Sequence, residues 1–314
     1  MIFHSSSSVF GLKSKLKKLQ IPKIYYFHSP WQKEYEITQS GIRNKSFLNF
    51  FASLFRKWHE SIYLQLSDGI VTLSESMRRE MLVSHKNISG YPYKILPGAA
   101  DQEVFYPSRN KVEKMNIRKS LGLSRDDIYI IVSRRLIDRT GIDILLEGFS
   151  LMLGKYSDSF KLKQPKLIIT GRGNRESFYK ELCCKLNLDK SVIFTGYVAE
   201  NVLGDYYRAS DLFIIPTKYL EGFGLATVEA MATGLPVIGT PVGGTEEILL
   251  QLDSKLLISS ITPESIAEKI YFMLNENLSL WSKKTLNFYK EKYSWEKHSR
   301  CLRSFINEIN NSHR

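Results

Sequence analysis

Short apolar runs alternate with amphipathic segments from about residue 110 onward. The runs are rich in β-branched residues and are strand-sized: 128–132, 166–170, 192–195, 212–215 and 236–239. Between the first two runs, apolar residues recur at the i, i+3, i+4, i+7 and i+11 positions of one helix face: Ile142, Leu145, Leu146, Phe149 and Leu153. This alternation predicts an α/β fold with a doubly wound parallel sheet.

Two further helices are predicted near the end of the chain. Thr262 precedes Pro263, the order of an N-cap followed by proline at the first helical position. The apolar stripe of that helix is formed by Ile266, Ile270, Met273 and Leu274. A last helix is expected to begin near Trp295 and run toward Ile309.

The first hundred residues have a similar pattern with fewer units. Strands are expected at 24–27, 69–73 and 93–96, with a helix from about Ser74. Pro, Ser and Asn cluster at 107–111, which is typical of a linker. We therefore expect an N-terminal domain over 1–107, a second domain over 108–290, and a C-terminal helix over 291–314 that packs back toward the first domain.

Composition narrows the class of protein. The apolar set makes up 43% of the 314 residues, which is typical of a globular chain and excludes disorder, collagen and a coiled coil as the main architecture. No apolar run is long enough to span a membrane, and the start lacks the order of a secretory signal. With only three cysteines, Cys183, Cys184 and Cys301, we expect a reducing, cytoplasmic setting.

Positive charge is concentrated at the N-terminal side. The chain carries 44 Lys and Arg against 32 Asp and Glu, a net charge of +12. Residues 1–100 hold 14 of these cations and 6 of these anions, so 14 − 6 = +8 of the net charge lies there. This excess indicates an anionic partner, whether phosphate, lipid headgroup or nucleic acid.

The segment 221–236 carries the densest chemical signal. Gly222-Phe223-Gly224 follows the strand at 212–215 and opens a helix, so it is a glycine turn at the carboxyl edge of the predicted sheet. Such a turn lets backbone N–H groups approach a phosphate. Glu221 and Glu229 flank it, and carboxylates accept hydrogen bonds from hydroxyls. The pair is either two solvated surface charges or the site of a ligand with a sugar on each side of a diphosphate.

The segment from Glu221 through Glu229 to Ile238 closely resembles the paired-glutamate motif of retaining nucleotide-sugar glycosyltransferases of family 4. Other motifs of that family match in order along nearly the whole chain. They are 133–136 with 141–146, 167–169 with 171–173, 192–194 with 196–198, Asp68 with 74–76, 97–101 with Phe105, and 26–30.

The resemblance implies two facing Rossmann-like domains, the GT-B fold, with an active site in the cleft between them. It also implies transfer of a sugar from a nucleoside-diphosphate donor to a glycan or lipid-linked acceptor with retention of configuration, as in polysaccharide assembly at the inner face of the membrane. No metal or other cofactor is expected. The family assigns the catalytic group to His28, Arg135 and Glu221.

By the same resemblance, each donor contact has a position in this chain. Glu221 would hold a hydroxyl of the transferred sugar, Glu229 the ribose, and Arg135 the diphosphate, while His28 would face the sugar. The remaining expected donor-binding residues would present backbone amides to the sugar and phosphates, frame the base or add positive charge. They are Arg139, Gly171, Gly196, Tyr197, Val198, Gly222, Phe223, Gly224 and Leu225.

Two departures from the family pattern stand out. Thr140 occupies the position of the usual lysine, and neighbouring Arg139 is the candidate substitute. The first domain also has about two strand–helix units fewer than expected, at about 30 residues per unit. We therefore expect a truncated N-terminal part, whose missing units a partner chain would supply.

Residues 47–58 form an aromatic helix face. It comprises Phe47, Phe50, Phe51, Leu54, Phe55 and Trp58, with Arg43, Lys45, Arg56 and Lys57 close by. Such a helix either packs on the sheet of the first domain or lies in a membrane interface, and the second alternative gives a peripheral membrane contact.

Three other functions compete with this one. A noncatalytic or partner-dependent nucleotide-sugar-binding subunit, or a truncated pseudoenzyme, remains an alternative to the enzyme. A nicotinamide dehydrogenase is disfavoured because the glycine turns lack the G-x-G-x-x-G pattern with an acid about 20 residues further on. Nucleic-acid binding is not expected, because no helix-turn-helix, RNP-like or zinc pattern occurs.

Overall fold

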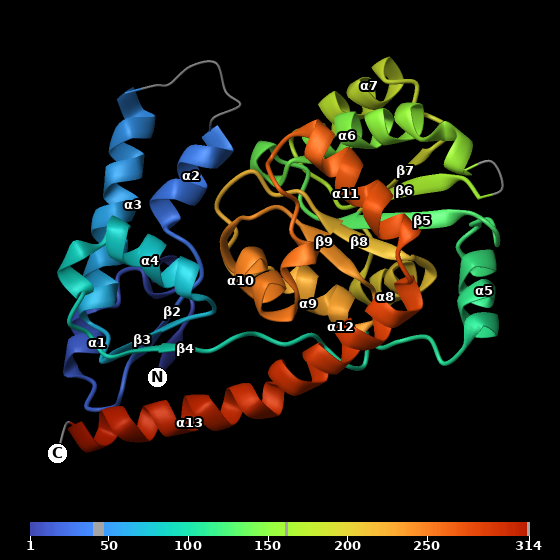
Figure 1. Cartoon of the computed structure of the whole chain (residues 1–314). Coiled ribbons are helices and arrows are strands. Elements are labelled where there is room, and N and C mark those ends of the chain that lie inside the picture. The colour runs from blue at the N-terminus through green and yellow to red at the C-terminus, as the bar shows by residue number, and fades with distance from the viewer. Residues whose placement is uncertain (40–46, 161–162, 313–314) are drawn as a thin grey trace. The chain divides into compact units, whose positions relative to one another are not determined.

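The computed structural model describes residues 1–39, 47–160 and 163–312, which form two compact units (Figure 1). Unit 1 consists of Met1–Gly98, Leu220–Phe223 and Trp295–Arg314, and unit 2 of Ala99–Tyr219 and Gly224–Ser294. The first change of unit falls at Gly98, ahead of the linker predicted at 107–111. Residues 99–107 group with unit 2 because Phe105 packs against Tyr207, with ring centroids 5.5 Å apart.

Unit 1 contains a four-stranded parallel sheet in the order β1-β2-β3-β4. Its strands are β1 (Ile2–Phe3), β2 (Ile24–Phe27), β3 (Gly69–Thr72) and β4 (Tyr93–Ile95). Its helices are η1 (Ser6–Val9), α1 (Lys13–Lys18), α2 (Trp31–Gln39), α3 (Phe47–Gln65), α4 (Glu75–Ser84), η2 (Lys86–Ile88) and α13 (Trp295–Ser312). The three strands predicted here are confirmed, and the two-residue β1 was missed because it is too short to show alternation.

Both faces of this sheet are covered. Tyr25 and Phe27 of β2 point into a cluster formed with side chains of α1, α3 and α4. Ile24 and Tyr26, which alternate with them, pack instead against Phe305 of α13. The C-terminal helix is therefore part of the core of unit 1.

Glu60 of α3 is a buried carboxylate that joins several elements of unit 1. One oxygen accepts hydrogen bonds from the Tyr25 hydroxyl (3.2 Å), and the other from the Trp31 backbone N–H (3.1 Å). The same second oxygen lies 3.0 Å from Nε2 of His85, whose Nδ1 lies 2.7 Å from Oγ of Ser61. These partners satisfy a charge that would otherwise be costly to bury, and they fix which face of α3 points inward.

Unit 2 contains a five-stranded parallel sheet in the order β7-β6-β5-β8-β9. Its strands are β5 (Ile128–Ser133), β6 (Pro165–Thr170), β7 (Val192–Gly196), β8 (Leu212–Ile215) and β9 (Val237–Gly239). The strand order reverses direction between β5 and β8, which is the doubly wound arrangement, so the predicted fold class and all five strands are confirmed.

Helices connect and cover these strands. They are α5 (Lys111–Ser120), η3 (Asp138–Thr140), α6 (Ile142–Lys155), η4 (Ser157–Phe160), α7 (Glu176–Lys185), α8 (Glu200–Ala209), α9 (Leu225–Ala232), α10 (Gly243–Leu252), η5 (Ser254–Leu256), α11 (Pro263–Asn275) and α12 (Leu278–Lys292). The predicted Thr262 cap is confirmed. Leu153 is half-buried, and Met152 is the fully buried member of the last turn of α6.

An ion cluster holds α5 against the sheet of unit 2. Arg118 donates to the carboxylate of Asp211 (2.7 Å) and to the carbonyl of Ala209 (2.8 Å). Asp211 also accepts from the Tyr129 backbone N–H (2.8 Å) and from Lys114 (2.7 Å). Because Asp211 directly precedes β8 and Tyr129 lies in β5, the cluster ties α5 to two neighbouring central strands.

None of the helices in the described parts of the chain has both the length and the apolar composition needed to cross a bilayer.

Substituting Arg118→Leu is expected to lower the free energy of unfolding by about 3 kcal/mol, because it leaves Asp211 and three backbone carbonyls without their main donor. Thermal and urea unfolding followed by circular dichroism measure this change. Arg125→Leu is the matched control, since Arg125 is exposed. Equal stability of the two variants would contradict the assignment of this role to Arg118.

Candidate functional site

The loops that follow the strands of unit 2 are joined to one another at the carboxyl edge of its sheet. The Arg134 N–H donates to the carbonyl of Thr170 (3.0 Å), and the Gly171 N–H donates to the carbonyl of Gly196 (2.8 Å). The loops after β5, β6 and β7 are therefore fixed by backbone hydrogen bonds. This is the edge at which ligands bind in open parallel sheets.

Two of these loops approach their neighbours too closely for any side chain. A Cβ placed on Gly171 would lie 1.9 Å from the carbonyl oxygen of Arg134, and one on Gly141 would lie 1.8 Å from that of Pro216. Both residues also have positive φ, +123° and +74°. Glycine at these positions is a steric requirement of the edge.

The helices that begin at this edge leave their first N–H groups without a side-chain cap. The N-cap residue makes no side-chain hydrogen bond in α6, α7, α8, α9 or α10. By contrast, Asn110, Thr262 and Asn277 cap α5, α11 and α12. Helix N-termini without a side-chain cap carry partial positive charge, so this edge is suited to an anion.

Helix α9 is the best suited of these five to bind an anion. Its N-cap is Gly224, in the left-handed conformation with φ +85°, and its first turn contains no acidic residue. The other four helices each carry an acid there. Exposed Leu225 begins α9. The predicted glycine turn therefore lies where a phosphate would meet the least repulsion.

Glu229 lies one turn further along α9 and is largely buried. The Tyr207 hydroxyl donates to its Oε2 at 3.4 Å. Burial raises the pKa of Glu229 to about 7, the Tyr207 hydrogen bond opposes this shift, and the charge of Glu200 adds to it. A carboxylate held with so few partners is available to accept hydrogen bonds from a ligand.

The arginine loop after β5 carries both predicted cations. Arg135 is exposed, whereas the Arg139 side chain is buried and its carbonyl accepts from the Lys218 N–H (2.8 Å). Thr140 donates its hydroxyl to the carbonyls of Ile137 (2.6 Å) and Arg135 (2.9 Å). Thr140 thus stabilises the 3-10 turn η3.

The loop after β7 holds the expected base contacts. Gly196 ends the strand with φ +69°, Tyr197 is 71% exposed and Val198 is half-buried. An exposed tyrosine beside the edge provides a stacking surface for a planar ring.

Sequence reasoning missed polar residues that support this edge. The Arg134 guanidinium donates to the hydroxyl of Thr217, which follows β8. The hydroxyls of Thr227 and Thr245 lie 3.2 Å apart beneath Gly224. Thr245 lies in the first turn of α10, and the glycine pair 243–244 after β9 is the signal that would have found it.

The remaining predicted residues group with unit 1. Glu221 and Phe223 are buried, and Leu220 before them has a positive φ of +56°. The Ser74 hydroxyl donates to the Gly222 carbonyl at 2.5 Å, and a Cβ on Gly222 would lie 3.0 Å from the carbonyl oxygen of His28. The segment Leu220–Phe223 and the loop after β2 are thus adjacent within unit 1.

His28 has a second histidine as its neighbour. Nε2 of His28 lies 3.0 Å from Nδ1 of His4, and the two rings stack with centroids 5.3 Å apart. Burial, with a smaller contribution from His4, lowers the pKa of His28. The folded structure therefore favours the neutral form of the His28 imidazole, and one of its nitrogens is oriented by His4.

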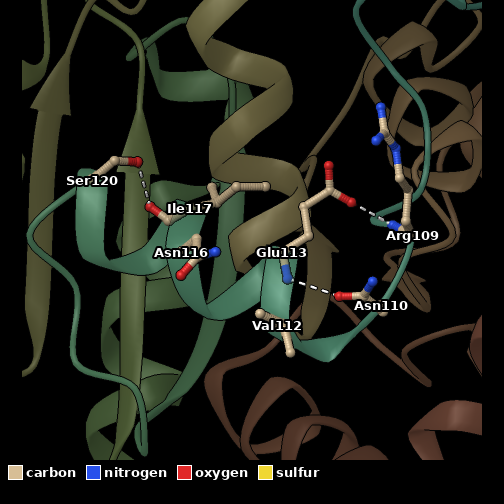
Figure 2. A pocket seen from close by; sticks show the side chains of 7 residues that line it. All are labelled: Arg109, Asn110, Val112, Glu113, Asn116, Ile117 and Ser120. Atoms are coloured by element: carbon tan, nitrogen blue, oxygen red, sulfur yellow. Dashed lines mark hydrogen bonds between the residues drawn. The ribbon is translucent and has the colours of Figure 1, made fainter.

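A hollow of about 640 Å³ lies along α5 (Figure 2). Its polar groups bond to one another, since Asn110 accepts from the Glu113 N–H (2.9 Å) and Glu113 accepts from the Arg109 N–H (2.6 Å). This is the arrangement of a helix cap. Because Lys114 and Arg118 tie α5 to Asp211, which precedes β8, the hollow lies away from the loops of the carboxyl edge, and none of the predicted residues lines it.

Comparison with known proteins identifies the family. Residues 113–295 match the model of the glycosyl transferases group 1 family, a region that contains the whole carboxyl edge described above. The chain belongs to this family. It is 30% identical, over 76% of its length, to an uncharacterised glycosyltransferase of Methanocaldococcus jannaschii, and 28% identical, over 72%, to the mannosylfructose-phosphate synthase of Agrobacterium fabrum.

Solved structures of such transferases share the GT-B fold of two Rossmann-like domains. The sucrose-phosphate synthase of Thermosynechococcus elongatus superimposes over 99% of this chain with a TM-score of 0.77 at 19% identity, and 73% of that protein is covered. Anabaena HepE in complex with UDP and glucose superimposes over 91% of this chain, with 72% of HepE covered, a TM-score of 0.70 and 17% identity. The chain covers 60% and 50% of the two curated relatives named above.

Substituting Gly171→Ala is expected to lower the free energy of unfolding by at least about 2 kcal/mol, because the new methyl group overlaps the Arg134 carbonyl and the φ of +123° is strained for alanine. Differential scanning calorimetry measures the change. Gly154→Ala is the control: this position in α6 is open, so alanine there is expected to raise stability by about 0.5–1 kcal/mol. An unchanged free energy of unfolding for Gly171→Ala would show that the close approach to the Arg134 carbonyl does not constrain the edge.

Glu229 makes stability depend on pH. Because its pKa is raised from 4.5 to about 7 on folding, its ionisation opposes folding, and this cost appears as the pH rises from about 4.5 to 7. The difference in unfolding free energy between Glu229→Gln and the wild type should therefore shift by about 3 kcal/mol in favour of the variant as the pH rises from 5 to 8. Urea titrations at both pH values test this. Exposed Glu181→Gln is the control, and a pH-independent difference for Glu229→Gln would contradict the shift.

Proposed function

We propose that the chain is a retaining glycosyltransferase of family 4 that uses a nucleoside-diphosphate sugar as its donor. The observation that carries the proposal is the row of uncapped helix N-termini at one edge of the second sheet, with α9 free of acidic residues in its first turn. The group 1 family match covers this edge, and HepE, which shares the fold, holds UDP and glucose.

The diphosphate is proposed to meet the N-terminus of α9. The backbone N–H groups of Phe223, Gly224 and Leu225, which follow Gly222, are the proposed hydrogen-bond donors. They need no reorganisation when negative charge develops on the diphosphate. Gly171 lets the loop after β6 lie directly against the Arg134 carbonyl, which fixes the edge on which the donor is proposed to bind.

The nucleoside is proposed to be held by Glu229 and the loop after β7. The Glu229 carboxylate accepts hydrogen bonds from the ribose hydroxyls, and Gly196, Tyr197 and Val198 frame the base. Since Glu229 must be ionised to accept at both oxygens, nucleotide affinity falls below about pH 7.

Arg135 is proposed as the catalytic cation. When the bond between the sugar and the diphosphate breaks, negative charge accumulates on the leaving oxygen, and an exposed guanidinium on the arginine loop neutralises it. Arg139, which is buried and lies on the same loop, is proposed to add to the positive potential at the diphosphate.

Glu221 and His28, both in unit 1, are proposed to hold the transferred sugar. Glu221 accepts from a sugar hydroxyl. His28, neutral and oriented by His4, presents a nitrogen or an N–H to another hydroxyl. Neither role needs a metal or another cofactor in our proposal.

The acceptor is proposed to be a glycan or lipid-linked sugar in polysaccharide assembly, on the cytoplasmic side of the membrane. Isothermal titration calorimetry with UDP-, GDP- and ADP-linked sugars tests donor binding, and release of nucleoside diphosphate tests turnover. Binding without turnover would favour a partner-dependent or noncatalytic subunit instead, and no binding by folded protein would refute both functions.

Arg135→Ala is expected to reduce kcat by about 10²–10³, because one preorganised cation at the leaving group is lost. Donor dissociation constants and thermal unfolding are measured alongside, and the unfolding temperature is expected to stay unchanged because Arg135 is exposed. Arg125→Ala, an exposed arginine of the same unit, is the control. Equal turnover of the two variants would remove Arg135 from the proposed mechanism.

A further inference from the structure

The outward face of α3 is apolar. Its exposed residues include Phe47 (77% exposed), Leu48 (76%) and Trp58 (60%). The others are Phe50, Phe51, Leu54 and Phe55. Of the two alternatives for this face, packing on the sheet of the first domain is therefore contradicted. Arg43 and Lys45, which the sequence analysis placed beside the face, lie outside the described residues.

The inward face of the same helix is polar over its first turns, the reverse of an ordinary surface helix, and becomes apolar only at Tyr63 and Leu64, which join the core. Ser53 donates to Glu36 of α2 at 2.5 Å, and Asn49 accepts from the Tyr35 hydroxyl of α2 at 3.0 Å. The Arg56 guanidinium lies over the ring of Tyr35 (3.7 Å), and Glu60 is buried in the network described above.

The two faces have the same spacing with a shift of two residues. Polar side chains lie at 49, 53, 56 and 60, and apolar ones at 47, 51, 54 and 58. At 3.6 residues per turn a shift of two residues is about 200°, so the stripes lie on opposite sides of α3. Each residue of the polar stripe contacts other side chains of unit 1, whereas the apolar stripe is exposed in the described structure.

Positive charge adjoins this face. Phe10 stacks on His59 of α3 (4.9 Å between centroids) and approaches the ring of Phe55 (6.3 Å). It leads into α1, which presents exposed Lys13, Lys15, Lys17 and Lys18. The first 33 residues contain no Asp or Glu.

Exposed apolar residues are interleaved with these lysines. Phe10, Leu12, Leu19 and Ile21 all lie at the surface. A protein partner would require matched pockets for each aromatic ring, whereas a bilayer interface accepts scattered aromatic and aliphatic side chains at one depth, with lysines reaching the headgroups.

We infer that the outward face of α3 and the lysine-rich segment from Phe10 to Ile21 together form a docking surface for an anionic lipid bilayer. The aromatic stripe enters the boundary between headgroups and acyl chains, and the lysines bind lipid phosphates. This surface lies within unit 1 and does not depend on donor binding in unit 2.

Co-sedimentation with vesicles tests the inference. The full chain is mixed with phosphatidylcholine vesicles with and without phosphatidylglycerol, at low and high salt. We expect binding to the anionic vesicles that weakens with salt. Phe51→Ser combined with Trp58→Ser should weaken it by about a hundredfold, and reversing Lys15, Lys17 and Lys18 to Glu should do the same on anionic vesicles.

Matched variants separate this surface from general effects. Leu250→Ser combined with Leu280→Ser removes two exposed apolar residues of unit 2 and should leave vesicle binding unchanged. Phe51→Leu combined with Trp58→Phe should retain vesicle binding. This result would show that Phe51→Ser and Trp58→Ser act through the loss of apolar surface. Circular dichroism and thermal unfolding verify that each variant is folded, independently of the proposed function.

Three results would overturn the inference. They are a wild-type chain that fails to bind anionic vesicles, serine variants that bind as well as the wild type, and sedimentation velocity showing a lipid-free dimer that the serine variants dissociate. The last result would assign the face to a second copy of the chain.

Discussion

Backbone contact between neighbouring loops determines the geometry of the second unit's carboxyl edge. Gly171 and Gly141 each lie directly against a carbonyl of the adjoining loop, so the turns after β5, β6 and β8 form one layer. With those turns fixed, helices α6 to α10 start at the same edge and leave their N–H groups pointing away from the sheet. The position of every proposed donor contact in unit 2 follows from this packing.

Each unit surrounds one carboxylate with several hydrogen-bond donors, and the two networks have different structural effects. In unit 2, Asp211 is surrounded by Arg118, Lys114 and a backbone N–H, which joins α5 to the sheet. In unit 1, Glu60 and its partners turn the polar side of α3 inward. The first network supports the rigid edge, and the second determines that the aromatic stripe of α3 faces outward.

Periodicity was sufficient to predict all of the second sheet, because buried parallel strands are continuous apolar runs between helices. It was insufficient for β1, which has two residues, and for the face of α3, because apolar spacing does not reveal which side a helix buries. The polar contacts of Asn49, Ser53 and Glu60 decide that. The glycine turn at Gly224 was found from sequence, whereas the support from Thr217 and Thr245 depends on contacts between distant loops.

The packing of α13 on the first sheet sets an order of events during synthesis. Phe305 and Ile309 complete a core that begins with Ile24, yet they are translated after every strand of unit 2. All strands of unit 2 emerge from the ribosome before them, so unit 2 is able to fold while one face of the first sheet still lacks its cover. A nascent chain stalled before Trp295 would expose that face, which makes it a natural substrate for chaperones.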